Sequence, residues 1–313
     1  MLNNKDLPKT LQQAIEFFSD KDVCFNFMVS MRWDNSIAIC QHCASDKTSF
    51  LSTRRIWKCK ACKKQFSIKT GTIFEDSPIS LDKWLTAMWL ICNAKNGISS
   101  YEIHRSIGVT QKTAWFMLHR IRLAMQNGSF EKLSGNVEAD ETFIGGKAKN
   151  MHKAKREAII QGRGSVGKTA VMGLLERKGR VLAKVIERTD RETLHNEVKE
   201  KVEAGSNLFT DEWRSYRGLD EQYIHEVINH SIEYVRGNVH TNGIENFWSL
   251  LKRTIRGTYV SVEPFHLPRY LDEQIYRFDE RKSNDKERFL RVLKAVSGKR
   301  LTYDELRGYQ TSQ

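Results

Sequence analysis

The sequence lacks the long hydrophobic runs that membrane insertion and secretion require. Its longest apolar run, WLTAMWLIC at residues 84–92, is about half of the roughly 20 residues that a membrane-spanning helix needs. The opening residues, MLNNKDLPKTLQQ, contain no apolar segment of the kind found in a secretory signal. We therefore expect a protein of the reducing cytoplasm, associated with the nucleoid and without a membrane partner.

Cysteine is scarce, and acidic residues are outnumbered by basic ones. Six cysteines in 313 residues do not suggest a disulfide framework in a reducing compartment. Lys and Arg total 51 against 38 Asp and Glu, which gives a formal net charge of +13. Residues 54–69 contain seven basic and no acidic side chains, and residues 147–168 contain seven basic and one acidic. Such clustering indicates a polyanionic partner, and nucleic acid is the leading candidate.

One nucleotide-binding pattern lacks its structural context. Residues 162–169, GRGSVGKT, match the pattern G-x-x-x-x-G-K-[ST]. That pattern binds phosphates where a strand leads into the glycines and a helix follows the Lys-Thr pair. Here the basic stretch KAKREAIIQ precedes the match and the strand-like AVMGLLER follows it, which reverses the required order. We expect no nucleotide cofactor, and the basic loop suits a DNA backbone instead.

Four of the six cysteines have the spacing of a structural zinc site. They form C-x2-C-x15-C-x2-C, in which each pair sits on a tight turn and four thiolates complete one tetrahedron: Cys40, Cys43, Cys59 and Cys62. Four unrelated buried cysteines are the alternative, which two matched pairs disfavour. His42 lies within the first pair, but four thiolates already fill the coordination shell. Cys24 and Cys92 lie in apolar sequence and are expected in the core.

Aromatic and basic residues surround the second cysteine pair. They form a ribbon that suits contact with phosphates, although a simply solvated lysine face is the alternative: Trp57, Lys58, Lys60, Lys63, Lys64 and Phe66. Lysine contacts with phosphate give affinity without sequence information.

The segment 99–125 predicts a helix-turn-helix. Ser99 and Glu102 have capping-box spacing, Gly108 favours a turn, and Thr110 can cap a second helix. The apolar positions of that helix share one face: Ala114, Trp115, Leu118, Ile121 and Met125. We expect four side chains to point outward towards base edges or phosphates: Gln111, Lys112, His119 and Arg120. An ordinary helical hairpin is the alternative.

From residue 135 onward the sequence predicts an α/β domain with a mixed sheet. Helices are expected at 189–205, where Thr189 and Glu192 have capping-box spacing, and at 241–255. Strands are expected at 135–146, 170–177, 180–188, 206–213 and 223–230, the second and third forming a hairpin.

Three acids stand out by their positions on these elements. Asp140 lies within a strand that is otherwise fit for burial, Asp211 ends the strand NLFTD, and Glu245 lies in the first turn of the last helix. A salt bridge explains any one of them alone. Three carboxylates at one place repel each other unless divalent cations hold them, and all-oxygen ligands favour Mg²⁺ or Mn²⁺.

The order of motifs resembles a known family. CQHC and CKAC are followed by VEADETFIGGK, GRGSVGKTAVMG, FTDEWRSY and HTNGIENFWSLLKR. This series is similar to the DDE transposases of bacterial insertion sequences, specifically the zinc-ribbon-bearing ISXO-like group. The resemblance implies an RNase H-like catalytic core with Asp140, Asp211 and Glu245 as its triad. It also implies a basic residue two turns after the glutamate, which Lys252 matches.

The resemblance further implies a DNA transposase that uses two Mg²⁺ or Mn²⁺ ions and one structural Zn²⁺. Such an enzyme recognises terminal inverted repeats, cleaves a strand and joins the freed 3′-OH to target DNA, working as a homodimer or larger assembly. Lys252 and Arg253 would hold the backbone near the cut. A DNA-binding regulator that no longer cleaves is the alternative, and a related Mg²⁺-dependent nuclease is a weaker one.

Several neighbours of the triad are left open. Glu138 shares a strand face with Asp140, whereas Glu141 and Glu212 are adjacent acids. Asn242 precedes Glu245 by about one helical turn and is a possible substitute for it; we favour Glu245, because a carboxylate binds Mg²⁺ better than an amide. The expected regions are a helical segment (1–35), a zinc ribbon (36–70), a helix-turn-helix module (78–130), the catalytic domain (134–280) and a helical tail (281–313).

Overall fold

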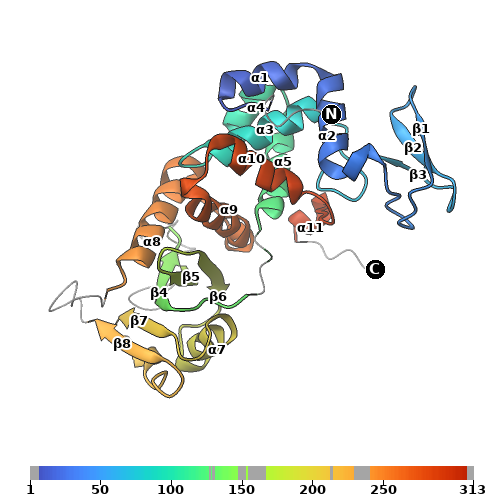
Figure 1. The fold of residues 1–313 in the computed structure, drawn as a ribbon. Coiled ribbons are helices and arrows are strands. Elements are labelled where there is room, and N and C mark those ends of the chain that lie inside the picture. Colours follow the sequence, from blue (N-terminus) through green and yellow to red (C-terminus); the bar gives the residue numbers. More distant parts are fainter. Residues whose placement is uncertain are drawn as a thin grey trace. The chain divides into compact units, whose positions relative to one another are not determined.

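The computed structural model describes residues 7–126, 131–146, 167–211, 214–228 and 240–308, together with residues 128 and 153. It divides into two compact units, one made of residues 1–126 and 282–313 and the other of residues 127–281 (Figure 1). The residues after Arg281 therefore share a unit with the N-terminal region. Among the described helices, none combines the length and hydrophobicity needed to cross a bilayer.

The first unit is built around a central helix, α3 (Leu81–Asn93), which packs against five other helices. Rings from three of these elements meet there, since Phe289 lies 5.3 Å from Trp89 and 5.5 Å from Phe18 between ring centroids. The helices around α3 are α1 (Leu11–Ser19), α2 (Lys21–Arg32), α4 (Ser100–Ile107), α5 (Gln111–Met125) and α10 (Asp285–Lys294). Shorter helices of this unit are η1 (Asp34–Ser36) and α11 (Tyr303–Leu306). A third, η6 (Glu280–Lys282), spans the boundary between the two units.

A three-stranded antiparallel sheet follows α2 in the same unit. Its order is β1 (Thr48–Leu51), β2 (Ile56–Cys59) and β3 (Gln65–Ser67). Trp57 and Phe66 pair across β2 and β3 and are buried, with ring centroids 6.0 Å apart. The expectation that these two rings line a phosphate-facing ribbon is therefore wrong, because they form the small core of the sheet. Lys58 lies between Trp57 and Cys59 on β2 and is exposed.

Helices α4 and α5 have the predicted caps and turn. Ser99 and Glu102 form a capping box, Gly108 adopts a left-handed conformation with φ of 62°, and Thr110 accepts a hydrogen bond from the Thr113 amide. The predicted apolar positions of α5 are buried or partly buried.

The outward face of α5 differs from the prediction at two positions. His119 is fully buried and Arg120 is 5% exposed, so the expectation that both point outward to DNA is wrong. The physical reason is that α5 is covered on more than one side. Arg120 donates hydrogen bonds to three backbone carbonyls, those of Ile73, Glu75 and Leu301, at 3.0, 2.7 and 3.0 Å.

The second unit contains a five-stranded mixed sheet of order β6-β5-β4-β7-β8. β4 pairs antiparallel with β5 and parallel with β7, β5 pairs antiparallel with β6, and β7 pairs parallel with β8. The strands span Asn136–Ile144 (β4), Thr169–Glu176 (β5), Val181–Ile186 (β6), Asn207–Asp211 (β7) and Ile224–Ile228 (β8). These strands confirm the predicted ones, and β5 begins directly after Lys168. A strand thus follows the GRGSVGKT motif, of which residues 162–166 lie outside the described part.

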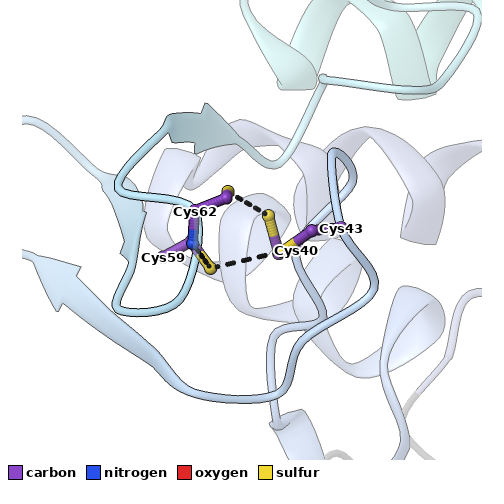
Figure 2. Close-up of side chains that lie close together, drawn as sticks. All are labelled: Cys40, Cys43, Cys59 and Cys62. Atoms are coloured by element: carbon purple, nitrogen blue, oxygen red, sulfur yellow. Dashed lines mark hydrogen bonds between the residues drawn. The ribbon is translucent and has the colours of Figure 1, made fainter.

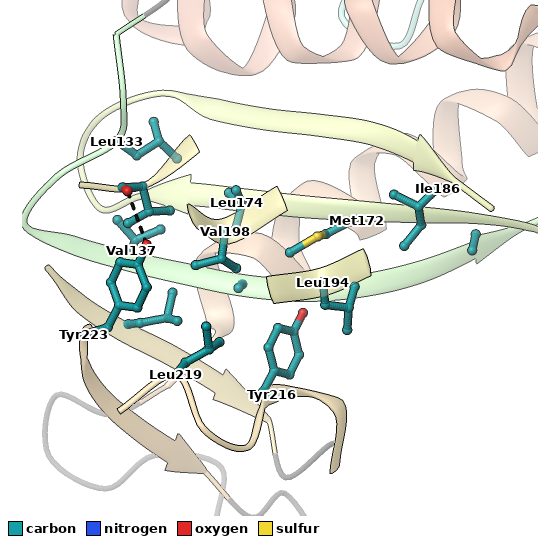
Figure 3. Close-up of a cluster of buried hydrophobic side chains, with 14 residues drawn as sticks. Leu133, Val137, Met172, Leu174, Ile186, Leu194, Val198, Tyr216, Leu219 and Tyr223 are labelled. Atoms are coloured by element: carbon teal, nitrogen blue, oxygen red, sulfur yellow. Dashed lines mark hydrogen bonds between the residues drawn. The ribbon is translucent and has the colours of Figure 1, made fainter. Parts of the chain in front are cut away.

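Helices cover both faces of this sheet. One face packs against α7 (Arg191–Lys201), through Leu194 and Val198 (Figure 3). The other face packs against α8 (Asn242–Thr254) and α9 (Leu267–Asp279). The expected Thr189 cap of α7 is wrong, because Asp190 is the N-cap and accepts from the Thr193 amide at 2.9 Å. Short helical turns are η3 (Arg214–Tyr216), η4 (Ile255–Tyr259) and η5 (Pro264–His266).

Candidate active site and metal centre

The four predicted cysteines converge at the zinc ribbon (Figure 2). Their sulfur atoms all lie within 4.8 Å of one another, with 3.7 Å between Cys40 and Cys62 and 3.6 Å between Cys43 and Cys59. Backbone amides of His42 and Cys62 approach the Cys40 and Cys59 sulfurs at 3.4 and 3.5 Å. Four thiols at this spacing fit one structural Zn²⁺ with a closed tetrahedral shell.

The other two cysteines are chemically different from this cluster. Hydrogen bonding from the Cys62 backbone lowers the pKa of Cys59 to about 6, which favours the thiolate that metal binding needs. Burial raises the pKa of Cys24 to about 12, so its thiol stays protonated. Cys24 and Cys92 are both buried, which confirms their predicted place in the core.

Asp140 and Asp211 lie on neighbouring parallel strands at matching positions. Glu138 on β4 pairs with Phe209 on β7, and the two aspartates each follow two residues later. Because side chains alternate along a strand, Asp140 shares the face of Glu138 and Asp211 shares that of Phe209. The two aspartates therefore lie on one face of the sheet, each two residues beyond the last paired positions of β4 and β7.

The carboxylates of Asp140, Asp211 and Glu245 are electrostatically coupled. Burial raises the pKa of Asp140 to about 7, and the negative charges of Asp211 and then Glu245 contribute to that rise. Glu245 lies in the first turn of α8, where the Thr241 hydroxyl donates to its Oε1 at 2.9 Å. The ligand oxygens of these three acids do not all lie within 4.8 Å of one another. Among the described residues, only the four cysteines form a metal-binding group by that measure. The three carboxylates therefore do not converge on a single ligand position in this structure.

Trp248 fixes the orientation of Asp140. Its indole Nε1 donates to Asp140 Oδ2 at 3.0 Å, so α8 is linked directly to β4. Gly173 pairs with Asp140 across β5, and a Cβ at Gly173 would lie 2.5 Å from the Trp248 ring. The absence of a side chain at Gly173 is what lets the indole reach over the sheet to the aspartate.

Glu138 holds the beginning of α8 against the sheet. Its side chain is 1% exposed, and its Oε2 accepts from the Ile244 amide at 2.9 Å, an amide in the first turn of the helix. Arg177 donates to Oε1 at 2.8 Å, and His240 lies 3.4 Å from the same oxygen. Glu138 and Trp248 thus fix α8 to the strand of Asp140 at two points, and this fixes the position of Glu245.

Glu141 lies on the opposite face of β4 from Asp140. Burial raises its pKa to about 8, while Tyr216 donates a hydrogen bond to its Oε1. Tyr216 itself is buried in the core beneath the sheet (Figure 3). Glu141 is therefore a buried acid held by a tyrosine, and Glu212 lies outside the described residues.

The basic candidates divide by location. Lys252 lies two turns after Glu245 on α8. Burial lowers the pKa of Lys252, and the negative charge of Asp140 partly offsets this shift. The adjacent Arg253 is exposed. The zinc ribbon presents four exposed lysines: Lys58, Lys60, Lys63 and Lys64.

At the start of α5, Gln111 is half-buried and donates to the Ser100 hydroxyl at 2.8 Å. Lys112 is exposed and lies 4.9 Å over the Tyr303 ring.

Glu138→Gln should destabilise the protein. The substitution would leave the Arg177 cation facing a neutral amide in a buried site, and removal of one partner from such a pair costs about 3 kcal/mol. For a unit of this size we expect the melting temperature to fall by roughly 5–10 °C in differential scanning calorimetry. Glu197→Gln is the matched control, since Glu197 pairs with the largely exposed Lys184 on the surface. Equal melting of the two variants would contradict a structural role for Glu138.

Two family models match the chain in the regions just described. The ISXO2-like transposase domain matches residues 132–279, which include the mixed sheet, α8 and α9. The transposase zinc-ribbon domain matches residues 19–65, which include all four clustered cysteines. The match over the ribbon agrees with the structural zinc site.

Two relatives extend the comparison. An uncharacterised protein in the transposable element ISH50 of Halobacterium salinarum is 27% identical over 255 residues, covering 76% of this chain and 84% of the relative. An uncharacterised transposase-like protein of Haemophilus influenzae is 34% identical over 103 residues, covering 33% of this chain and 83% of the relative. The first relative is thus a protein of a transposable element, and the second is transposase-like.

Proposed function

The chain belongs to the ISXO2-like transposase family, and from this premise we propose that it is a metal-dependent DNA transposase. It would recognise the terminal inverted repeats of its element, cleave a DNA strand there, and join the freed 3′-OH to target DNA. The transposase and zinc-ribbon matches imply DNA binding, in agreement with the net charge of +13.

The observation that carries this proposal is the group of acids around Asp140. The negative charges of Asp211 and Glu245 both raise the pKa of Asp140, although the three acids come from three different elements. Burial of mutually repelling carboxylates is costly, and divalent cations offset that cost. The donors are all oxygens, which Mg²⁺ and Mn²⁺ prefer over Zn²⁺. Asp140, Asp211 and Glu245 are thus the residues that we propose to hold the metal.

The order of the sheet supports an RNase H-like core. An antiparallel β6-β5-β4 arrangement continues into two parallel strands, β7 and β8, with helices on both faces. β4 and β7 are neighbours in this sheet, and α8 packs against β4. Asp140 on β4, Asp211 on β7 and Glu245 on α8 would form the triad of such a core.

The chain's own residues would hold and orient the reacting groups. Two divalent cations bound there would activate water or a 3′-OH and stabilise the leaving oxygen. Trp248 keeps Asp140 in one orientation, and Glu138 fixes the helix that carries Glu245. Lys252, on the same side of α8 as Glu245, would bind the phosphate next to the cut.

We assign sequence recognition to the first unit. The exposed ribbon lysines suit phosphates, and α4 with α5 would act as a helix-turn-helix, with Lys112 available at the start of the second helix. His119 and Arg120 are excluded from this surface by their burial. Since two element ends must be joined together, we expect a dimer or larger assembly on DNA.

The test is incubation of purified protein with labelled DNA carrying the ends of its own element, with Mn²⁺ or Mg²⁺. We expect a nick at the element boundary and, with added plasmid, joined products. Binding without cleavage under either metal would instead favour a DNA-binding regulator derived from a transposase.

A further inference from the structure

A groove of about 510 Å³ lies beside the candidate active site within the second unit. One wall is the end of β4 with the two glycines that follow, Gly145 and Gly146. The other wall is formed by residues 252–262, where α8 ends and the chain turns. Lys252 belongs to both places, because it lines the groove and interacts with Asp140. The groove therefore begins at the candidate active site.

Three cations gather at this groove. Lys252 and Arg256 line the groove directly. The positive charges of Arg256 and Lys168 both lower the pKa of Lys252, so all three cations lie near one another. Lys168 is the lysine of the GRGSVGKT motif, and a Cβ on Gly145 would lie 3.3 Å from its Cα, so its backbone packs against the groove wall. Like charges brought this close repel, and a polyanion bound among them offsets the repulsion.

The far wall ends in a strained turn that exposes an apolar side chain. Val260 has φ of 63° and ψ of −55°, and the Ser261 amide donates to the Tyr259 carbonyl at 2.7 Å. This is a γ-turn with positive φ, a rare conformation that is costly for a β-branched residue. Val260 is 78% exposed, although it lines the groove.

The surrounding residues hold this turn in place. Helix α8 widens into a π-helical turn, η4, whose last residue Tyr259 donates to the buried Glu273 of α9 at 2.5 Å. The Tyr259 and Tyr270 rings lie 4.7 Å apart in an edge-on arrangement, and Arg277 pairs with Glu273. Strain of this kind persists where neighbouring contacts enforce it, and it gathers at ligand-binding positions.

We propose that this groove binds a single strand of DNA adjoining the cut, with Lys168, Lys252 and Arg256 on its phosphates and Val260 against a base. The proposal rests on the transposase function and names the part of the substrate that this surface takes. A single strand fits better than a duplex, because an apolar tip needs the face of a base, which stacking covers in a duplex. The groove lining also includes the apolar residues Ile144 and Ile255.

Two variants of the full chain test the two kinds of contact with a fluorescent 12-nucleotide single strand, measured by anisotropy at several salt concentrations. Lys252→Ala/Arg256→Ala should reduce the slope of log Kd against log salt by about 1.4, or about 0.7 for each phosphate that is no longer neutralised. Val260→Gly should weaken binding roughly fivefold without changing the slope, because it removes only apolar area. Its melting temperature should stay unchanged or rise, since glycine adopts positive φ without strain.

Matched controls separate the groove from the rest of the surface. Lys199→Ala removes an exposed cation on α7, and Ile224→Thr reduces an exposed apolar side chain on β8. Both should bind the single strand like the native chain. A photo-crosslinking amino acid at position 260 should label the single strand, whereas the same group at position 224 should not.

The outcomes distinguish this proposal from the transposase function. Unchanged salt slope and affinity in the groove variants, or crosslinking of duplex alone, would overturn the groove even if the protein cleaves element ends. If the protein never cleaves DNA but both groove variants weaken single-strand binding, the groove proposal would stand and the proposed transposase function would fail.

Discussion

Asp140→Asn should abolish metal-dependent cleavage of element-end DNA while leaving DNA binding nearly unchanged. The amide keeps the shape of the side chain but removes the charge that a divalent cation requires. Loss of several kcal/mol of transition-state stabilisation lowers the cleavage rate on the order of 10³-fold or more. Single-turnover cleavage and a gel-shift assay on the same DNA measure the two properties separately.

Asp211→Asn and Glu245→Gln should have the same effect, since the charges of both acids raise the pKa of Asp140 and so belong to the same site. Asp220→Asn is the matched control, an exposed aspartate in the same unit. Asn242→Ala tests the third member of the triad, because Asn242 begins α8 one turn before Glu245. Cleavage by Glu245→Gln together with its loss in Asn242→Ala would move that role to the asparagine.

Normal cleavage by all three acid variants would refute the proposed active site. DNA binding should survive in all three variants whatever the cleavage result, because the ribbon lysines and α5 belong to the other unit. The separation of affinity from chemistry is what makes the experiment decisive. A protein that binds but does not cut even with all three acids intact fits the regulator instead.

The sheet was predictable because its signals are local. Strand β4 and the β5-β6 hairpin are short apolar runs ended by turn residues, and the structure places all of them where the sequence predicts. The positions of Asp140 within β4 and of Asp211 at the end of β7 follow from those same runs. Only the family resemblance links them to Glu245, since no local pattern specifies which helix crosses which strands.

The errors on α5 and the zinc ribbon have a different origin. His119 and Arg120 occupy helix positions that look polar and outward, yet Arg120 donates to the carbonyl of Leu301 near the other end of the chain. No periodicity within α5 indicates that a distant segment returns to cover it. Trp57 and Phe66 are buried for a similar reason, because Phe25 of α2 and Trp33, from an earlier part of the chain, pack against their rings.

Glu138 shows what a strand pattern leaves undecided. Its spacing from Asp140 indicates a shared face, but equally fits a metal ligand and a structural acid. The structure gives it Arg177, His240 and the Ile244 amide as partners, which come from a hairpin turn and from the region of α8. Its role in positioning α8 depends on these long-range contacts, and Gly243 permits them, since a Cβ there would lie 2.7 Å from Glu138 Oε2.

Cys59→Ser should release the structural zinc and unfold the ribbon. The native chain should carry about one zinc per polypeptide after gel filtration, and the variant close to none, by elemental analysis. The ribbon has only three short strands and a core of a few rings, so metal binding supplies most of its folding free energy, about 10 kcal/mol or more in isolated zinc modules. Limited proteolysis should then cut between residues 36 and 70.

Cys24→Ala is the control that separates zinc loss from general damage. Cys24 is fully buried in α2 and its thiol stays protonated, so this variant loses packing but keeps its zinc. Because Lys58, Lys60, Lys63 and Lys64 lie on the ribbon, unfolding it should weaken DNA binding in the Cys59 variant alone. A zinc-free protein that binds DNA with full affinity would show that these four lysines are a solvated face, and that recognition depends on α4 and α5.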